Sequence, residues 1–366
     1  MKLTTCEIFS FRLPLKYPLN IAGKKLLYRD GLLLKLENDK GDTGWGEVSP
    51  LPGLHSETIE ECARGIGKTI DHWTEKVSAL KNLGNLETLG DLSTHLSTKS
   101  ARFGLESALL NLLVSHRQHR LGSLLKPNYA QSVQISGLLI DSGEEALQQV
   151  LRLYESGYRS IKIKVGRRQP EEEQNMLRRV TAETPPDLHF RLDANRAWTL
   201  DEALRFTRGL PTERIEYMEE PLKDPQELRR FCSESSISVA LDETLAEAGC
   251  TEYLAIPNVS AAVLKPAVLG GIAATIRMAR EAKKAGCTAV ISDTFSSGVG
   301  LAVHLLLAAE LGAESAAGLD TYRYLEKDIL LKPLTVHRGQ MHVAGSLSRA
   351  KKLNITMLKK YNLFNA

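Results

Sequence analysis

Apolar and polar side chains alternate with a period of two near the start of the chain. Residues from Lys2 to about Arg12 and from Gly31 to Glu37 follow this period, and Gly41, Gly44 and Gly46 come after them. Alternation of this kind is typical of half-buried strands, and glycines mark turns. The pattern therefore predicts a meander of antiparallel strands.

A helical period follows the predicted meander. Apolar residues recur at helical spacing from about Glu57 to Val77, behind the potential N-cap Ser56, and again from about Ser100 to Val114. The first third of the chain is thus predicted to be an α+β unit. After about Leu334 the pattern again resembles surface strand and helix, and we expect this tail to rejoin the first unit.

The rhythm changes at about Ser132, where short apolar runs begin to alternate with amphipathic stretches. Helix-start signals precede several of these stretches, such as Pro170 before three glutamates, and Thr199 followed by Glu202. Eight strands alternating with helices indicate an α/β fold with a (β/α)₈ barrel, although a doubly wound open sheet would show much the same pattern. The predicted strands are Val133–Leu138, Ser160–Val165, His189–Leu192, Ile215–Met218, Ser238–Leu241, Ala261–Leu264, Thr288–Ile291 and Ala317–Leu319.

Composition narrows the class of protein. The 366 residues include 43% hydrophobic and 25% charged side chains, the balance of an ordinary globular protein. The formal charge is only +3, and Lys and Arg are scattered among Asp and Glu, which disfavours a nucleic-acid partner. The five cysteines are far apart and form no C-x-x-C pair, as expected for reduced thiols. Met1 to Phe11 lacks the apolar run of a signal peptide or membrane span, so we expect a cytoplasmic protein without a membrane partner.

Charged residues fall at the ends of five consecutive predicted strands. The intervals between them are 29, 26, 23 and 23 residues, about one βα unit each. In a barrel, the C-terminal ends of the strands form the edge where active sites are built. Any one such residue could merely cap the following helix, but coincidence is a poor explanation for five in register. The residues are Lys164, Asp193, Glu219, Asp242 and Lys265.

Three of these five residues are acids, and their carboxylates should converge. Uncompensated, Asp193, Glu219 and Asp242 would repel one another in a partly desolvated pocket. A divalent cation removes that cost, and an all-oxygen ligand set favours Mg²⁺, or Mn²⁺ as a substitute, over zinc. Glu220 points to the opposite face of an extended strand from Glu219, so we assign Glu219 to the metal and Glu220 to a supporting role.

Lysines flank the predicted metal site on both sides. Lys162 and Lys164 alternate with Ile161 and Ile163, so both should point into the barrel mouth. A lysine acts as a base near neutral pH only if its pKa falls, and the ammonium of Lys162 together with the metal charge would lower the pKa of Lys164. Lys265 is expected on the other side of the metal.

These residues resemble, in order and spacing, the muconate-lactonising subgroup of the enolase superfamily. The front part of the chain, with Gly44-Trp-Gly-Glu47-Val-Ser-Pro50 and the Glu106–Asn111 segment, is similar to the capping domain of that family. The matching motifs are Lys162-x-Lys164, Asp193-x-Asn195, Glu219-Glu220-Pro221, Asp242-Glu243 and Leu264-Lys265-Pro266. The resemblance implies an enolase-type modified (β/α)₈ barrel over residues 129–334. It also implies an α+β capping domain formed by residues 1–128 and the C-terminal tail, 335–366.

The resemblance also implies a chemistry. A small-molecule carboxylate would bind Mg²⁺ held by the three acids, Lys164 would take the proton beside that carboxylate, and Lys265 would stabilise the intermediate. The segment Ile291–Gly300 resembles the serine-rich segment of the o-succinylbenzoate synthases in this subgroup, with Asp293 and Ser296 departing from the usual pattern. Those enzymes dehydrate a cyclohexadiene carboxylate in menaquinone synthesis. The expected substrate contacts are Asn195, Ser292, Thr294 and Gly318.

Several alternatives stay open beside this hypothesis. Racemisation of an N-acylamino acid or epimerisation of a dipeptide would use the same lysines, but the epimerases carry two aspartates at the eighth strand and only Asp320 is found here. A sugar-acid dehydratase would need a histidine base, and His304 falls in an apolar helix typical of core packing. A non-catalytic barrel is a third alternative. The segment Leu15 to Lys24 is interpreted either as a mobile lid or as an ordinary surface loop.

Overall fold

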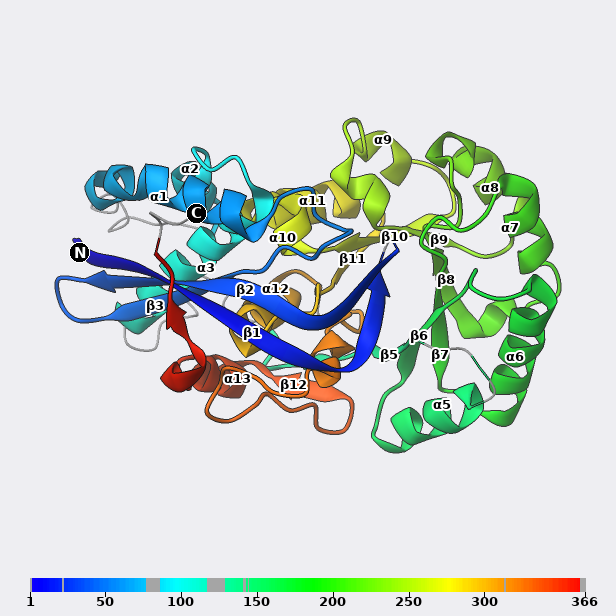
Figure 1. The fold of residues 1–366 in the computed structure, drawn as a ribbon. Helices are drawn as coiled ribbons and strands as arrows, with labels where there is room; N and C mark the ends of the chain where they lie inside the picture. The colour runs from blue at the N-terminus through cyan, green and yellow to red at the C-terminus, as the bar shows by residue number, and fades with distance from the viewer. Residues whose placement is uncertain are drawn as a thin grey trace.

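The chain folds into an antiparallel sheet with its own helices beside a barrel of parallel strands (Figure 1). The computed structural model describes residues 2–21, 23–76, 86–116, 129–140, 143, 145–312 and 314–362. The parallel barrel and the antiparallel cap confirm the predicted fold class. The domain boundaries at residues 128 and 335 stay predictions.

The antiparallel sheet has the strand order β13-β1-β2-β3. Consecutive strands β1, β2 and β3 pair in turn, which confirms the predicted meander. The tail strand β13 pairs with Phe9 and Ser10 of β1, so the end of the chain rejoins this sheet as expected. The elements of this part are β1 Leu3–Ile21, β2 Lys24–Asn38, β3 Thr43–Val48, α1 Ile59–Lys76, α2 Leu89–Ser93, α3 Lys99–His116 and β13 Lys359–Lys360.

The first two strands are longer than the sequence pattern predicted. Leu13, Leu15 and Leu19 are buried and prolong β1 beyond Arg12, with a register shift after Pro14 where the imino acid lacks a donor. The segment Leu15 to Lys24 is therefore the far end of a β-hairpin, and its interpretation as an ordinary surface loop is wrong. In Figure 1 this hairpin reaches across to the parallel strands of the barrel.

Gly44 and Gly46 lie within β3 and allow helix α3 to pack closely on this strand; they do not form a turn. A Cβ atom at Gly46 would lie 1.8 Å from the carbonyl oxygen of Gly104, and one at Gly44 would lie 2.1 Å from that of Ala108. Only glycine lets helix α3 lie directly on the strand backbone. The prediction that Gly44 and Gly46 mark a turn was wrong, whereas Gly41, with a φ of +79°, does lie in the turn before β3.

The barrel contains seven parallel strands in the order β11-β10-β9-β8-β7-β6-β5. Their cores are apolar, because helices cover the outside and the strands are buried on both faces. The strands are β5 Gly137–Leu139, β6 Ser160–Lys164, β7 His189–Asp193, β8 Ile215–Glu219, β9 Val239–Leu241, β10 Val259–Leu264 and β11 Thr288–Ile291.

The eighth position of the barrel is filled by a bridging segment. Ala317 pairs with Ile135 and Gly318 pairs with Ser292, so these two residues join the ends of the seven-stranded sheet. The predicted strand Ala317–Leu319 is thus only two isolated bridges. A Cβ atom at Gly318 would meet the Ser292 hydroxyl at 2.7 Å, so the close approach needs glycine.

The first predicted strand of the barrel divides into two. Its early residues form β4, Ser132–Gln134, which pairs antiparallel with β12, Gln340–His342, before α13, Val343–Ala350. Its last residues enter β5 and pair with β6. Apolar alternation spans both pieces, which is why the sequence pattern could not separate them.

Helices alternate with the barrel strands as predicted, and α5 to α8 form the outer wall at the right of Figure 1. Thr199 and Glu202 form the predicted capping box, and Pro170 opens its helix. The helices are α5 Ala146–Glu155, α6 Pro170–Glu183, α7 Leu200–Thr207, α8 Leu228–Glu234, α9 Thr251–Leu254, α10 Pro266–Leu269, α11 Ile272–Lys284 and α12 Gly298–Leu311.

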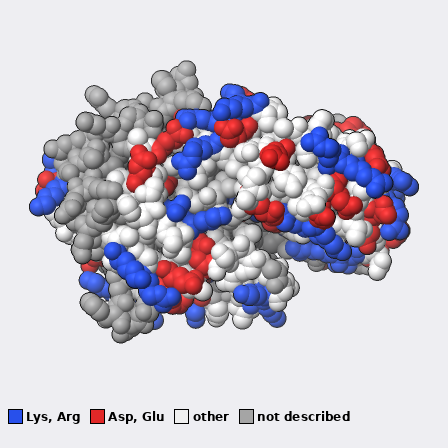
Figure 2. All heavy atoms as spheres, turned by 90° about the horizontal axis from the view of Figure 1, so that it is seen from above, with Lys and Arg blue, Asp and Glu red and all other residues white. Residues whose placement is uncertain are grey.

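Surface charge and thiols agree with the composition. Figure 2 shows Lys and Arg interspersed with Asp and Glu over the visible face. All five cysteines are free thiols, and four of them are buried. Within the described ranges, the helices are too short or too polar to cross a bilayer.

Candidate active site

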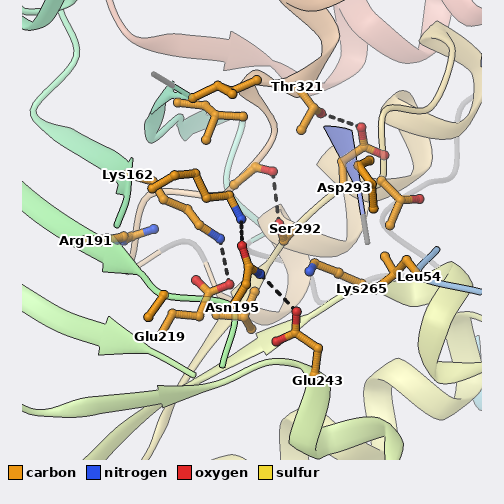
Figure 3. Close-up of a pocket in the computed structure, with 18 of the residues that line it drawn as sticks. Leu54, Lys162, Arg191, Asn195, Glu219, Glu243, Lys265, Ser292, Asp293 and Thr321 are labelled. Atoms are coloured by element: carbon orange, nitrogen blue, oxygen red, sulfur yellow. Dashed lines mark hydrogen bonds and ion pairs between the residues drawn. The ribbon is translucent and has the colours of Figure 1, made fainter. Parts of the chain in front are cut away.

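A cavity of about 570 Å³ opens at the C-terminal ends of the barrel strands. Its wall comes mainly from residues at these strand ends, and Figure 3 shows ten of its lining residues by name. Leu19 on the β1–β2 hairpin and Leu54 after β3 close it from the capping side. Both parts of the chain therefore shape one cavity.

The charged strand ends lie in register across the sheet. Lys164 of β6 pairs with Asp193 of β7, and Asp193 pairs in turn with Glu219 of β8. Asp242 follows β9 directly and Lys265 follows β10 directly. Neighbouring parallel strands thus deliver these five side chains to one edge, as the spacing predicted.

Lysine ammonium groups neutralise the three carboxylates. Lys162 Nζ lies 2.6 Å from Asp193 Oδ2 and 2.6 Å from Glu219 Oε1, while Lys164 Nζ lies 2.6 Å from the same Asp193 oxygen. Lys265 forms an ion pair with Asp242. In Figure 3, Lys162 and Lys265 approach from opposite sides of Asn195.

The neighbours of each lysine set the direction of its pKa. Burial would lower the pKa of Lys162, but Asp193, Glu219 and Asp242 raise it well above its usual value. The pKa of Lys164 is lowered, first by burial and then by the charge of Lys162, which outweigh the attraction of Asp193. For Lys265, Asp242 outweighs burial and raises the pKa. The pKa values of Lys164 and Lys265 are therefore shifted in opposite directions.

The donor set fits a hard cation in its chemistry. Every predicted ligand atom is a carboxylate oxygen, and Glu219 Oε2 is buried without a hydrogen-bond partner. In the part of the chain that the structure describes, however, no three His, Cys, Asp or Glu side chains are grouped closely enough to hold an ion. Asp193, Glu219 and Asp242 would therefore hold a cation in exchange for some of their present lysine contacts.

Glu220 holds the turn that carries Asp242. Its Oε1 accepts from the backbone N–H of Asp242 at 2.7 Å and of Thr244 at 2.8 Å, and its Oε2 accepts from Arg196 at 3.0 Å. Glu220 has a φ of +43°, so the chain turns sharply there and sends consecutive glutamates to different neighbours. This geometry suits the supporting role predicted for Glu220.

The four expected substrate contacts all line the cavity. Asn195 accepts from Lys164 at 2.6 Å and donates to Glu243 at 3.0 Å, and burial raises the pKa of Glu243 to about 7. Ser292 donates to Gly318 at 3.3 Å. Thr294 Oγ1 is buried without a partner, which leaves it available to a ligand. Contact with a substrate stays a prediction for all four.

His304 is packed in the core, as its apolar helix indicated. It is 1% exposed and stacks on Phe103 with ring centroids 4.8 Å apart. Its Nδ1 lies 3.0 Å from Asp293 Oδ1. Asp293 in turn accepts from Thr321 Oγ1 at 2.6 Å and from the backbone N–H of Ser296, so this unusual aspartate braces the turn beside the cavity.

Two buried charges of the capping sheet hold the same turn, and sequence reasoning missed their role. Arg29 donates to the carbonyl of Phe295 at 3.1 Å, where Phe295 has a left-handed φ of +58°. Glu47 accepts from Ser297 N at 3.0 Å and Gly300 N at 2.9 Å at the start of α12. The one signal in the sequence was the charged pair Arg29 and Asp30 directly before an apolar strand run.

Comparison with known proteins agrees with this architecture. The family model described as enolase C-terminal domain-like matches residues 145–346, and the one described as MenC, N-terminal domain matches residues 3–112. Among solved structures, the muconate lactonizing enzyme from Pseudomonas fluorescens has a TM-score of 0.79 at 20% identity and covers 93% of this chain and 94% of its own. The dipeptide epimerase from Enterococcus faecalis, complexed with Mg and a dipeptide, has a TM-score of 0.79 at 22% identity, covering 94% and 97%. Both show the fold.

Curated relatives extend over nearly the whole chain. The o-succinylbenzoate synthase of Enterobacter sp. (strain 638) is 30% identical over 327 residues, covering 88% of this chain and 92% of the relative. That of Edwardsiella ictaluri is 31% identical over 326 residues with the same coverage. Because these relatives match both the cap and the barrel, the chain belongs to the o-succinylbenzoate synthase family of the enolase superfamily and is an enzyme.

Proposed function

We propose that this enzyme is a lyase that dehydrates 2-succinyl-6-hydroxy-2,4-cyclohexadiene-1-carboxylate to o-succinylbenzoate. The observation that carries the proposal is the pair Lys164 and Lys265, which line one cavity while bound to different carboxylates, Asp193 and Asp242. The names of the curated relatives support the same reaction.

Lys164 performs both proton transfers in the proposed reaction. Its amine takes the proton beside the ring carboxylate, and the resulting ammonium returns that proton to the departing hydroxide on the same face. One C–H bond and one C–O bond break, water leaves, and the ring becomes aromatic without any change in redox state. Asn195, 2.6 Å from Lys164, orients the amine.

Lys265 stays protonated and stabilises the electron-rich ring from the opposite side. The nearby carboxylate of Asp242 outweighs burial and raises the pKa of Lys265, which keeps the side chain charged. Leu19 and Leu54 on the capping side exclude water above the ring. The cavity thus supplies a base on one side and a fixed positive charge on the other.

Asp193, Glu219 and Asp242 would hold Mg²⁺, with Mn²⁺ as a substitute. When bound, the cation supplies positive charge that stabilises the negative charge developing on the substrate carboxylate. The all-carboxylate set and the unpartnered Glu219 Oε2 support this assignment. The Mg complex of the E. faecalis epimerase, a protein of the same fold, is consistent with it.

Racemisation or epimerisation is the second candidate function. Dipeptide epimerases share the fold, and opposed lysines suit a reaction with a base on each face. Against it, the carboxylate of Asp320 already accepts from Tyr158 Oη at 2.8 Å, from Leu138 N at 2.9 Å and from Arg323 at 2.5 Å. Asp320 is therefore not free to hold a substrate ammonium, which favours dehydration.

The test is turnover of the cyclohexadiene substrate with Mg²⁺, followed by absorbance of the aromatic product. Lys164→Ala should lower kcat by roughly 10²–10⁴-fold because the proton acceptor is lost, and EDTA should abolish activity until Mg²⁺ is restored. Lys223→Ala is the matched control, since Lys223 lies on the barrel surface with a side chain 59% exposed. Unchanged turnover in Lys164→Ala with intact circular dichroism would refute the assignment. Exchange of the α-hydrogen with inversion, and no aromatic product, would favour the epimerase.

A further inference from the structure

The proposed product carries two carboxylates, and only the ring carboxylate is accounted for by the chemistry above. A second carboxylate, at the end of the succinyl chain, would be costly to enclose without a cation or several hydrogen-bond donors. Among the described residues, five basic side chains line the cavity, so each can be tested for whether its charge is already engaged. They are Lys162, Lys164, Arg167, Arg191 and Lys265.

The charges of four of these side chains are already engaged. The three lysines are bound to Asp193, Glu219 and Asp242 as described above. Arg191 is 2% exposed, and its guanidinium donates to Glu216 at 2.7 Å, to the carbonyl of Ala316 at 2.7 Å and to Ser315 Oγ at 2.8 Å. Every nitrogen of Arg191 therefore already donates to a partner, and the charge of the guanidinium is paired with Glu216.

Arg167 differs from the other four. It is exposed, and its Nη1 donates to a neutral acceptor, the carbonyl of Ile140, at 3.1 Å. Across the described ranges of the chain, no carboxylate lies within ion-pair distance of its guanidinium. Among the residues that the structure describes, Arg167 is thus a cavity cation whose charge no acid neutralises.

The backbone at Arg167 is held firmly, so the side chain starts from a fixed point. The buried carboxylate of Glu173 accepts from the N–H groups of Gly166 at 2.7 Å, Arg167 at 3.0 Å and Arg168 at 3.1 Å. Gly166, with a φ of +74°, makes the turn that follows Lys164 and Val165. Arg167 therefore stands three residues after the proposed base, on a loop tied to α6.

Arg167 also lies at the mouth of the cavity. It lines both the cavity and the larger outer groove, as do Leu19 and Asn20 of the β1–β2 hairpin and Ile140 after β5. A ligand whose ring lies at Lys164 and whose flexible tail points outward would pass this position. A guanidinium there can bind a terminal carboxylate through two parallel N–H···O bonds.

We propose that Arg167 binds the second carboxylate of a dianionic substrate and so selects for succinyl-type side chains. This inference rests on the proposed function for the identity of the ligand. Arg167 takes no part in bond breaking, so it is a specificity residue. Its removal should weaken binding of the dianion while leaving the chemical step almost unchanged.

The experiment compares two ligands by titration calorimetry in the presence of Mg²⁺. One is o-succinylbenzoate, and the other is 2-butanoylbenzoate, in which a methyl group replaces the terminal carboxylate. The wild-type enzyme should bind the dianion at least tenfold more tightly. Arg167→Gln should lose at least tenfold in affinity for o-succinylbenzoate and less than twofold for the analogue, with KM rising and kcat changing less than threefold. Arg167→Lys should recover part of the loss.

The neighbouring Arg168 provides the matched control, because it lines the outer groove and does not belong to the cavity wall. Arg168→Gln removes the same charge nearby and should change both affinities less than twofold. The inference is overturned if Arg167→Gln keeps the wild-type preference, or if the wild-type enzyme shows no preference or binds neither ligand. If the wild-type enzyme does not turn over the cyclohexadiene substrate but Arg167→Gln still loses the preference for o-succinylbenzoate, the proposed reaction is rejected. Arg167 then remains the residue that binds the second carboxylate.

Discussion

Replacing Glu47 by glutamine tests whether the capping sheet stabilises the turn beside the cavity, at the start of α12. Glu47 is 1% exposed and its carboxylate accepts four hydrogen bonds. Oε1 accepts from Ser49 Oγ at 2.7 Å and Ser297 N at 3.0 Å, and Oε2 accepts from Ser297 Oγ at 2.5 Å and Gly300 N at 2.9 Å. Each oxygen thus serves one hydroxyl and one backbone N–H.

The cost of Glu47→Gln follows from that arrangement. In either orientation of the glutamine amide, its NH₂ group replaces one carboxylate oxygen and faces a backbone N–H, with which it cannot form a hydrogen bond. The serine hydroxyl on the same side can rotate and accept from the NH₂ group. One buried N–H is left unsatisfied, at about 1–3 kcal/mol. Loss of the negative charge at the start of α12 adds ~1 kcal/mol. The free energy of unfolding should fall by about 2–4 kcal/mol, or roughly 3–5 °C in Tm for a chain of this length.

Urea unfolding followed by circular dichroism, together with a thermal scan, measures this change. Glu37→Gln on β2 is the matched control, because Glu37 has a side chain 33% exposed and an ion pair with Lys35 at 3.1 Å. This pair is partly exposed to solvent, and ion pairs at the surface contribute about 0–1 kcal/mol. If Glu47→Gln is no less stable than Glu37→Gln, Glu47 does not join the two parts of the molecule as argued.

Two further predictions concern acid stability and close packing. Burial alone would raise the pKa of Asp293, but contacts with His304, Ser296 and Thr321 lower it below its usual value. The ionised Asp293 therefore stabilises the fold above about pH 4, and this stabilisation is lost as the pH falls. Asp293→Asn should flatten the pH dependence of the unfolding free energy between about pH 2.5 and 4.5, by up to ~1.4 kcal/mol per pH unit. An unchanged slope, measured by urea unfolding at several pH values, would contradict this. A Cβ at Gly46 would lie 1.8 Å from the Gly104 carbonyl, whereas one at Gly65 on α1 meets nothing nearer than 3.8 Å. Gly46→Ala should therefore lower Tm or prevent folding, whereas Gly65→Ala should add about 0.5–1 kcal/mol, and equal effects of the two would refute the packing argument.

The sequence by itself determined the barrel edge of the site. Apolar runs at βα spacing fix which residues end each strand, and parallel strands place those ends at one edge whatever the remaining details of the fold. Lys164, Asp193 and Glu219 could therefore be assigned to one place, and the structure sets them in direct register. The antiparallel meander was predictable from the local pattern, because β1, β2 and β3 are consecutive in the chain and pair in turn.

Only the tertiary structure decided how each charge is engaged and what closes the cavity. Alternation does not reveal that a strand such as β1 continues past Pro14, or that glycines of β3 serve a helix, because both depend on partners distant in sequence. The same holds for Glu47, whose carboxylate binds the start of a helix about 250 residues later in the chain. It also holds for Arg167, whose guanidinium has no acid within ion-pair distance among the described residues. Electrostatic energy depends on distances in space, and a linear pattern of residues does not contain them.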